Sequence, residues 1–110
     1  MQKISLEALA RQQLEKAVTA GGGHTADTVY GGHEKVLRQT VIGMIQGSHL
    51  AEHANPGEAT VQVLRGRVRL LAGEVVWEGR AGDLIIVPNS RHSLEALEDS
   101  ALLLTVAKLP

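Results

Sequence analysis

The stretch GSHLAEHANPGEATVQVLRG, residues 47–66, contains the local signals that decide the fold. Its Asn55–Gly57 segment has the composition of a tight turn, because proline fixes one backbone angle and glycine adopts conformations that other residues avoid. From Ala59 to Leu64, apolar and polar residues alternate, which is typical of a strand with one buried face. A turn followed by such a strand predicts β structure in this part of the chain.

Short strands and turns continue on both sides of this stretch. Glycine or proline separates most of the apolar segments, and the connections are too short for the crossovers of a parallel sheet. The sequence therefore predicts an all-β fold of roughly seven to nine antiparallel strands in a sandwich or barrel. The other strands are expected around Val29–Tyr30, Val36–Gln46, Val68–Leu71, Val75–Glu78, Leu84–Val87, Leu94–Leu97 and Ala101–Ala107.

The N-terminal segment has a different pattern. Ser5 to Val18 carries a broad apolar stripe at helical spacing, Ser5 can cap the first turn, and glycines 21–23 end the helix. The predicted organisation is a helix with a glycine-rich linker over residues 1–22, followed by a barrel domain over residues 23–110. A chain of 110 residues can support one such domain.

The composition excludes several classes of function. Eleven Lys and Arg residues face twelve Asp and Glu residues, for a net charge of −1, so nucleic acid is not an expected partner. The chain has no cysteine, which excludes disulfides and thiolate metal sites. No apolar run approaches the roughly 18 residues of a membrane span, and the N-terminus lacks the apolar centre of a signal peptide. We therefore expect a cytoplasmic protein that does not act at a membrane.

The opening stretch resembles the first of the two signature motifs of the cupin superfamily. That motif has a glycine, then His-x-His after five residues, then a glutamate and a second glycine. Gly47, His53 and Gly66 match it in spacing. The position of the second histidine is Asn55, and that of the glutamate is Ala59.

A later segment, GDLIIVPNSRH at residues 82–92, resembles the second cupin motif. Gly82, Pro88 and His92 match in order, although Ser90 replaces a glycine and the turn is one residue shorter. The resemblance covers about Gly43–Lys108 and implies a cupin-type antiparallel β-barrel, or jelly roll. The whole chain also resembles a group of small single-domain bacterial cupins of the RmlC-like type that have no assigned activity.

The resemblance implies a cavity lined by His53 and His92. Cupin enzymes commonly hold a metal on three histidines and one glutamate, and imidazole suits one divalent Zn, Mn, Fe or Ni ion. In an unbroken strand His49 would share the face of His53 and could supply a third imidazole, whereas a bulge between them would turn His49 outward. The further candidates for the cavity or its rim are Asn55, Glu58 and Gln62.

The sequence leaves the chemistry of this cavity open. The two histidines could hold a metal, or they could be bonded to each other, to a carbonyl or to water in a metal-free pocket. One hypothesis is a cupin that binds a small molecule, with the catalytic residues, if any, unknown. The alternative is a metal-dependent enzyme, dioxygenase-like or isomerase-like, with a His-only metal site. A metal-free epimerase would need a tyrosine acid, and Tyr30 is the only tyrosine.

Two surface features complete the predictions. Arg65, Arg67 and Arg69 are expected on one outer strand face, paired with Glu74 and Glu78 of the neighbouring strand. Trp77 is expected to fill a core or dimer contact. A homodimer is expected for two reasons. The resemblance to small cupins implies it, because these proteins commonly pair as homodimers. A small barrel also leaves apolar strand edges that need to be covered.

Overall fold

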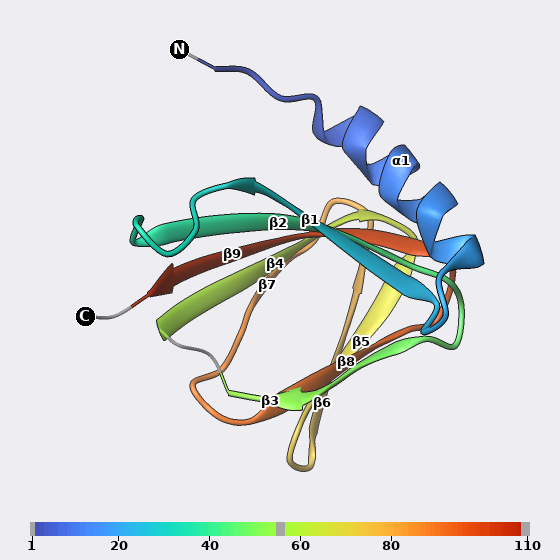
Figure 1. Ribbon diagram of the computed structural model, residues 1–110. Helices are drawn as coiled ribbons and strands as arrows, with labels where there is room; N and C mark the ends of the chain where they lie inside the picture. The colour runs from blue at the N-terminus through green and yellow to red at the C-terminus, as the bar shows by residue number, and fades with distance from the viewer. Residues whose placement is uncertain (1, 55–56, 109–110) are drawn as a thin grey trace.

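A computed structural model describes residues 2–54 and 57–108 of the chain. These residues form one helix followed by nine strands (Figure 1). The all-β fold with one N-terminal helix is confirmed. The elements are α1 (Leu6–Thr19), β1 (His24–Tyr30), β2 (Leu37–Met44), β3 (His49–His53), β4 (Gly57–Arg65), β5 (Arg67–Ala72), β6 (Val75–Arg80), β7 (Leu84–Ile86), β8 (His92–Ala96) and β9 (Ser100–Lys108).

The strands form two antiparallel sheets that face each other. The five-stranded sheet has the order β1-β2-β9-β4-β7, and the four-stranded sheet has the order β3-β8-β5-β6. Figure 1 shows them as two layers, with α1 on the outer side of the five-stranded sheet. Strands adjacent in a sheet are mostly distant in sequence, as β2, β9 and β4 are, which is the arrangement of a jelly roll.

The core lies between the inner faces of the two sheets. On β4 the alternation predicted from the sequence holds, because Ala59, Val61 and Val63 are buried while the residues between them are more exposed. The facing sheet contributes Val68 and Leu70 from β5. The interior is filled mainly by small and branched aliphatic side chains together with Met44, in a chain that has no phenylalanine.

The helix packs closely on the outer face of the five-stranded sheet. Ser5 caps it by accepting a hydrogen bond from the Ala8 N–H at 3.2 Å, as its sequence predicts. Ala10, Gln13 and Ala17 form its buried face. The Gln13 carbonyl also accepts a 2.8 Å hydrogen bond from the Thr25 hydroxyl of β1, which ties the helix to the sheet.

No helix in the described parts of the chain has the length and apolarity needed to cross a membrane.

Gly43 is the position at which α1 comes closest to the sheet. A Cβ added there would lie 2.4 Å from the carbonyl carbon and oxygen of Gln13, so the helix backbone would have to move. We expect Gly43→Ala to lower the free energy of unfolding by about 2–3 kcal/mol, the upper part of the usual cost of overpacking, because the clash is with backbone atoms. Urea denaturation measures this loss. The control is Gly21→Ala, where nothing lies within 4 Å of the added Cβ, and equal stability of the two variants would contradict the prediction.

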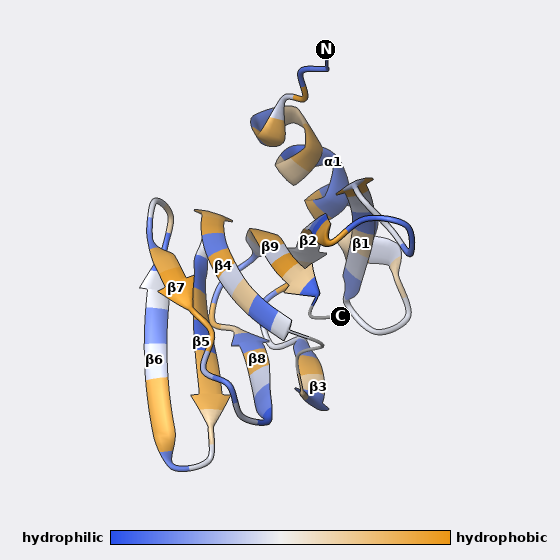
Figure 2. Cartoon of the chain, turned by 90° about the vertical axis from the view of Figure 1, so that its left-hand side faces the viewer, coloured by the Kyte–Doolittle hydropathy of each residue, from blue (hydrophilic) through white to orange (hydrophobic). Residues whose placement is uncertain are grey.

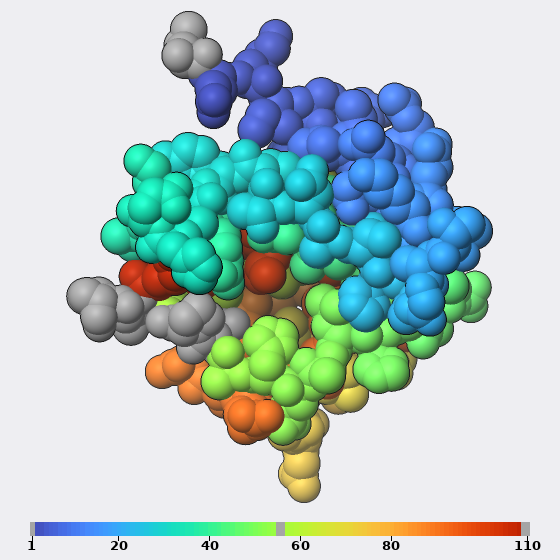
Figure 3. All heavy atoms as spheres, in the orientation of Figure 1, coloured from blue at the N-terminus to red at the C-terminus, as the bar shows by residue number. Residues whose placement is uncertain are grey.

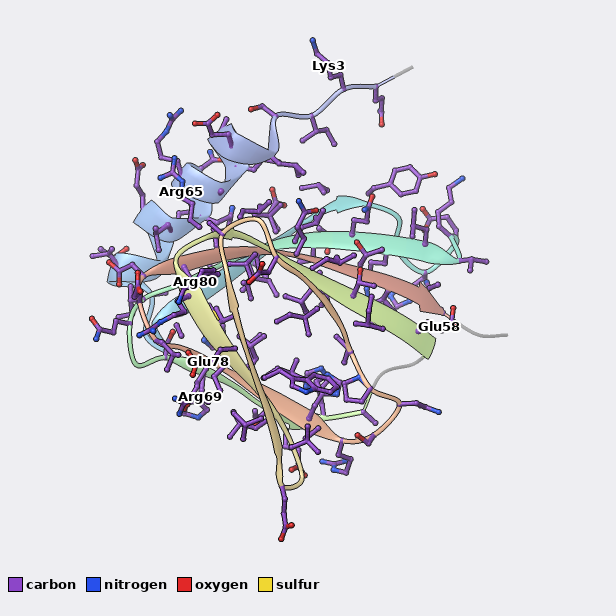
Figure 4. All side chains as sticks on the ribbon, turned by 180° about the vertical axis from the view of Figure 1, so that it is seen from behind. Lys3, Glu58, Arg65, Arg69, Glu78 and Arg80 are labelled. Carbon is purple, nitrogen blue, oxygen red and sulfur yellow. The ribbon has the colours of Figure 1, made fainter. Side chains whose placement is uncertain are left out.

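At Gly66 the chain passes from one sheet to the other. β4 ends at Arg65 in the five-stranded sheet and β5 begins at Arg67 in the four-stranded sheet. The prediction that the three arginines share one strand face is therefore wrong, and Figure 4 shows Arg65 far from Arg69. Arg67 and Arg69 do pair with Glu78, each at 3.8 Å, as predicted for the outer face.

Candidate functional site

Two histidines from neighbouring strands meet at the candidate site. His53, the last residue of β3, is opposite His92, the first residue of β8, in the pairing of these antiparallel strands. Their ring centroids are 4.7 Å apart with the ring planes tilted by 58°. His92 is buried, with 5% of its surface exposed, whereas His53 is exposed. We call these two residues the histidine pair.

The backbone holds both rings in the same way. Nδ1 of His53 lies 2.9 Å from the carbonyl oxygen of Ala51, and Nδ1 of His92 lies 2.9 Å from that of Ser90. A carbonyl only accepts hydrogen bonds, so each Nδ1 carries the proton in the neutral ring. Each Nε2 is then left with its lone pair, ready to accept a hydrogen bond or to bind a metal.

A bulge in β3 separates His49 from the histidine pair. The register pairs His49 with Glu95 and Leu50 with Leu94, and it shifts between Leu50 and His53. Residues opposite each other in a sheet share a face. His49 therefore lies with Glu95 on the outer face, where Glu95 accepts a 3.1 Å hydrogen bond from Arg69. The unbroken strand that would place His49 beside His53 is not present.

The other predicted rim residues are not brought to the histidine pair either. Glu58 is exposed at the start of β4, on the opposite face from buried Ala59 (Figure 4). Gln62 lies between the buried residues Val61 and Val63, so it faces outward from the five-stranded sheet. Asn55 lies outside the described residues.

Apolar side chains that the sequence reasoning did not single out continue the inner face beside the histidine pair. Leu94 follows His92 by two residues on β8 and is 5% exposed, and Leu50 opposite it packs against the core. His92, Leu94 and Ala96 are the buried residues of β8, and their spacing of two in the sequence could have predicted that they share the inner face. The histidine pair is thus a polar end to an otherwise aliphatic interior.

The surface is hollowed between the two sheets on the side of β3. Figure 3 shows this opening between the β1–β2 segment in cyan and green and the β3 segment in light green, with later strands visible deeper inside. Because His53 is exposed and His92 is buried, the histidine pair runs from the surface toward the interior.

An ion pair on the outside links the two segments that carry the histidines. Arg91 Nε donates to Glu52 Oε1 at 3.0 Å, and Arg91 Nη2 donates to the Glu52 carbonyl at 3.4 Å. Both side chains are more than half exposed, so solvent screens the pair and its contribution to stability is small. It joins the residue before His53 to the residue before His92.

The residues present fit only part of a cupin metal centre. Within residues 2–54 and 57–108 no three His, Asp or Glu side chains are grouped closely enough to hold an ion. The position of the family's glutamate is Ala59, whose side chain points inward and is 5% exposed. Two imidazoles remain whose Nε2 atoms are bonded by no other residue among those described, which is fewer than the three or four protein ligands of ordinary zinc sites.

Comparison with known proteins gives structural matches. The chain matches no protein-family model and no curated protein sequence. It is similar to a conserved protein of unknown function from Streptococcus pyogenes, at 25% identity and a TM-score of 0.73, over 83% of this chain and 79% of that one.

Two further solved structures support the same fold. A cupin superfamily protein from Desulfitobacterium hafniense is 11% identical, with a TM-score of 0.72 over 78% of each chain. An RmlC-like cupin from Shewanella frigidimarina is 22% identical, with a TM-score of 0.69 over 81% of this chain and 79% of that one. The chain thus has the RmlC-like cupin fold, and its structural neighbours are small cupins.

Proposed function

We propose that this cupin binds a polar small molecule at the mouth of its barrel, with His53 and His92 as the recognising groups. The observation that carries the proposal is the anchoring of both Nδ1 atoms on backbone carbonyls at 2.9 Å. This anchoring fixes the orientation of both rings and leaves two Nε2 atoms for a ligand. Aliphatic residues of the inner face, among them Leu50 and Leu94, would surround its apolar part.

The ligand class follows from these groups. Neutral Nε2 accepts hydrogen bonds from hydroxyl groups, and a protonated imidazole donates them to carboxylates. The aromatic fraction of the chain is only 2%, which argues against recognition by stacked rings. Small hydroxylated compounds and organic acids therefore suit the site better than flat aromatic compounds.

Thermal-shift screening with a panel of small organic acids, polyols and sugars tests this proposal. We expect His53→Ala to weaken the binding of any stabilising compound by about 10-fold, the value of one or two lost hydrogen bonds. His49→Ala is the matched control, because it removes another exposed histidine of β3 on the opposite face. A compound that binds the His53→Ala variant as well as the wild type, or a panel without any binder, would contradict the proposal.

The second candidate is a metal-dependent enzyme, and the observation in its favour is the Nδ1 anchoring of both rings, which leaves each Nε2 without a partner among the described residues. Its His-only site needs a third imidazole, which His49 does not provide from the outer face. The test is metal analysis of protein purified without chelator. One redox-active metal per chain that is lost in both His53→Ala and His92→Ala would favour the enzyme over the binding protein. Cytoplasmic location and the lack of nucleic-acid or membrane partners stay predictions.

A further inference from the structure

The acidic side chains of the protein all lie away from the space between the two sheets. None of the twelve Asp and Glu residues, all within the described parts of the chain, is on an inner face. Arg38 and Lys108, by contrast, start from the inner face of the five-stranded sheet. The space between the sheets is therefore positive in a chain whose net charge is −1. The acids lie on α1, in turns between strands, and on outer strand faces at Asp27, Glu52, Glu58, Glu78 and Glu95.

The register of β2 establishes the face from which Arg38 starts. It is unbroken over Leu37–Met44, and it pairs Arg38 with Val106 and Ile42 with Leu102. Val106, Ile42 and Leu102 belong to the core between the sheets. Because residues opposite each other and residues two apart in a strand share a face, Arg38 is on the inner face as well.

Arg38 differs from the arginines of the outer faces in its surroundings. Arg67, Arg69 and Arg91 each form ion pairs of 3.0–3.8 Å with glutamates. Arg38 forms no ion pair with any of the residues that the structure describes, although it is half-buried. A charge that is partly withdrawn from water without a partner costs free energy, and a bound anion would offset this cost.

Arg38 and the histidine pair border the same opening. β3 ends at His53 and the chain enters the other sheet at Gly57, so both residues lie at one end of the barrel. The register places Arg38, Val106 and Ala59 in one row across β2, β9 and β4, near this end. Figure 2, which views the barrel from this side, shows β1 and β2 above the opening and β3 below it. Arg38 and the histidine pair thus approach the opening from opposite sheets.

Two threonine hydroxyls lie beside Arg38 on the same inner face. Thr40 follows Arg38 by two residues, and the register pairs it with Thr28 of β1. Their Oγ1 atoms are 3.3 Å apart. Two hydroxyls form one hydrogen bond between them, which leaves one O–H to donate elsewhere. Arg38 and the two threonines therefore offer hydrogen-bond donors to an oxygen anion.

We propose that the ligand of the histidine pair is a small organic acid whose carboxylate binds Arg38, next to the Thr28 and Thr40 hydroxyls. This inference rests on the proposed function and narrows its ligand class. A guanidinium presents two parallel N–H donors that match the two oxygens of a carboxylate. Its single charge balances a carboxylate better than the roughly two charges of a phosphate group. A hydroxyl group of the same acid would donate to Nε2 of the histidine pair.

Calorimetric titration at pH 8 and low salt tests this inference with matched probes, namely lactate, malate and gluconate, each beside its uncharged amide. An ordinary imidazole is neutral at this pH, so a preference for the acid reports the guanidinium. We expect the wild type to bind at least one acid about 10-fold more tightly than its amide, because hydrogen bonds between charged groups are the stronger ones. Arg38→Gln should lose this preference, and Arg38→Lys should keep part of it.

Arg11→Gln, at an exposed position of α1, is the matched control and should bind the probes as the wild type does. Thermal unfolding checks that each variant is folded. Equal affinity of the wild type for acid and amide would overturn the inference, and so would a preference that persists in Arg38→Gln. Inorganic phosphate that binds more tightly than every acid would overturn the choice of a carboxylate.

His53→Ala separates this inference from the proposed function. Binding that is weakened in His53→Ala and unchanged in Arg38→Gln would overturn the role of Arg38 alone. Binding that is weakened in Arg38→Gln and unchanged in His53→Ala would overturn the proposed role of the histidine pair and leave Arg38 as the anion site. A protein that binds none of the probes would overturn both.

Discussion

Replacing Gly66 with alanine is expected to lower the free energy of unfolding by about 4 kcal/mol, a large part of the stability of a small domain. Gly66 has a φ of +79°, and an alanine in this left-handed region costs about 1–2 kcal/mol. The added Cβ would also lie 2.3 Å from the Asp99 carbonyl oxygen and from the Ser100 hydroxyl. Overpacking against such neighbours costs a further 1–3 kcal/mol or so.

The neighbours of Gly66 have little freedom to move. Ser100 is fully buried, and its hydroxyl accepts a 3.1 Å hydrogen bond from the Arg67 N–H while it lies 2.7 Å from the Glu98 carbonyl. These bonds hold the start of β9 against the start of β5, where the chain crosses between sheets. A methyl group at Gly66 would therefore disturb both sheets at their junction.

Gly47→Ala separates the two causes. Gly47 is also a glycine of the first motif and has a φ of +87°, but nothing lies within 4 Å of its added Cβ. The Gly47→Ala variant should therefore lose only the free energy that the left-handed backbone conformation costs an alanine, about 1–2 kcal/mol. Urea or thermal unfolding of both variants measures the difference. Equal losses would show that the Asp99–Ser100 contact adds nothing.

Much of the fold could be predicted because its signals are local. Three signals are of this kind: the alternation on β4, the cap at Ser5, and the spacing of residues within each of the two motifs that contain Gly47 and His92. Each depends only on residues that are close together in the sequence. The role of Gly66 was not accessible in this way. Its position suggested an interruption in one strand, whereas its positive φ and its contact with residues 99–100 send the chain into the other sheet.

The candidate site was only partly predictable for a related reason. The rule that alternate residues of a strand share a face correctly described β4. On β3 the same rule required an unbroken strand. The bulge after Leu50 changes which side chains of β3 face inward. A bulge is set by the pairing with β8, forty residues further along the chain, and has no clear signature in residues 49–53. The bonds from each Nδ1 to a carbonyl two residues earlier were likewise visible only in the structure.

Replacing Ala59 with glutamate is expected to raise the affinity for Zn²⁺ by about 10-fold or more. By resemblance, Ala59 occupies the position of the glutamate ligand in cupins, and its side chain is buried on the inner face of β4. A carboxylate there would add a third protein ligand to the two imidazoles, which is the number found in catalytic zinc sites. Without metal, the buried carboxylate should destabilise the protein by about 2–3 kcal/mol.

Zinc titration by calorimetry and thermal unfolding with and without Zn²⁺ measure both effects. Binding of zinc to the folded state should raise the melting temperature of Ala59→Glu well above the rise in the wild type. Ala59→Gln is the control, because glutamine has the size of glutamate but carries a neutral amide, which is a much weaker zinc ligand than a carboxylate. His92→Ala in the Ala59→Glu background should remove the gain. Equal zinc affinity of the Ala59→Gln and Ala59→Glu variants would contradict the prediction. So would a gain in zinc affinity that persists without His92. In either case Ala59 does not face the histidine pair, and the glutamate position must be assigned elsewhere.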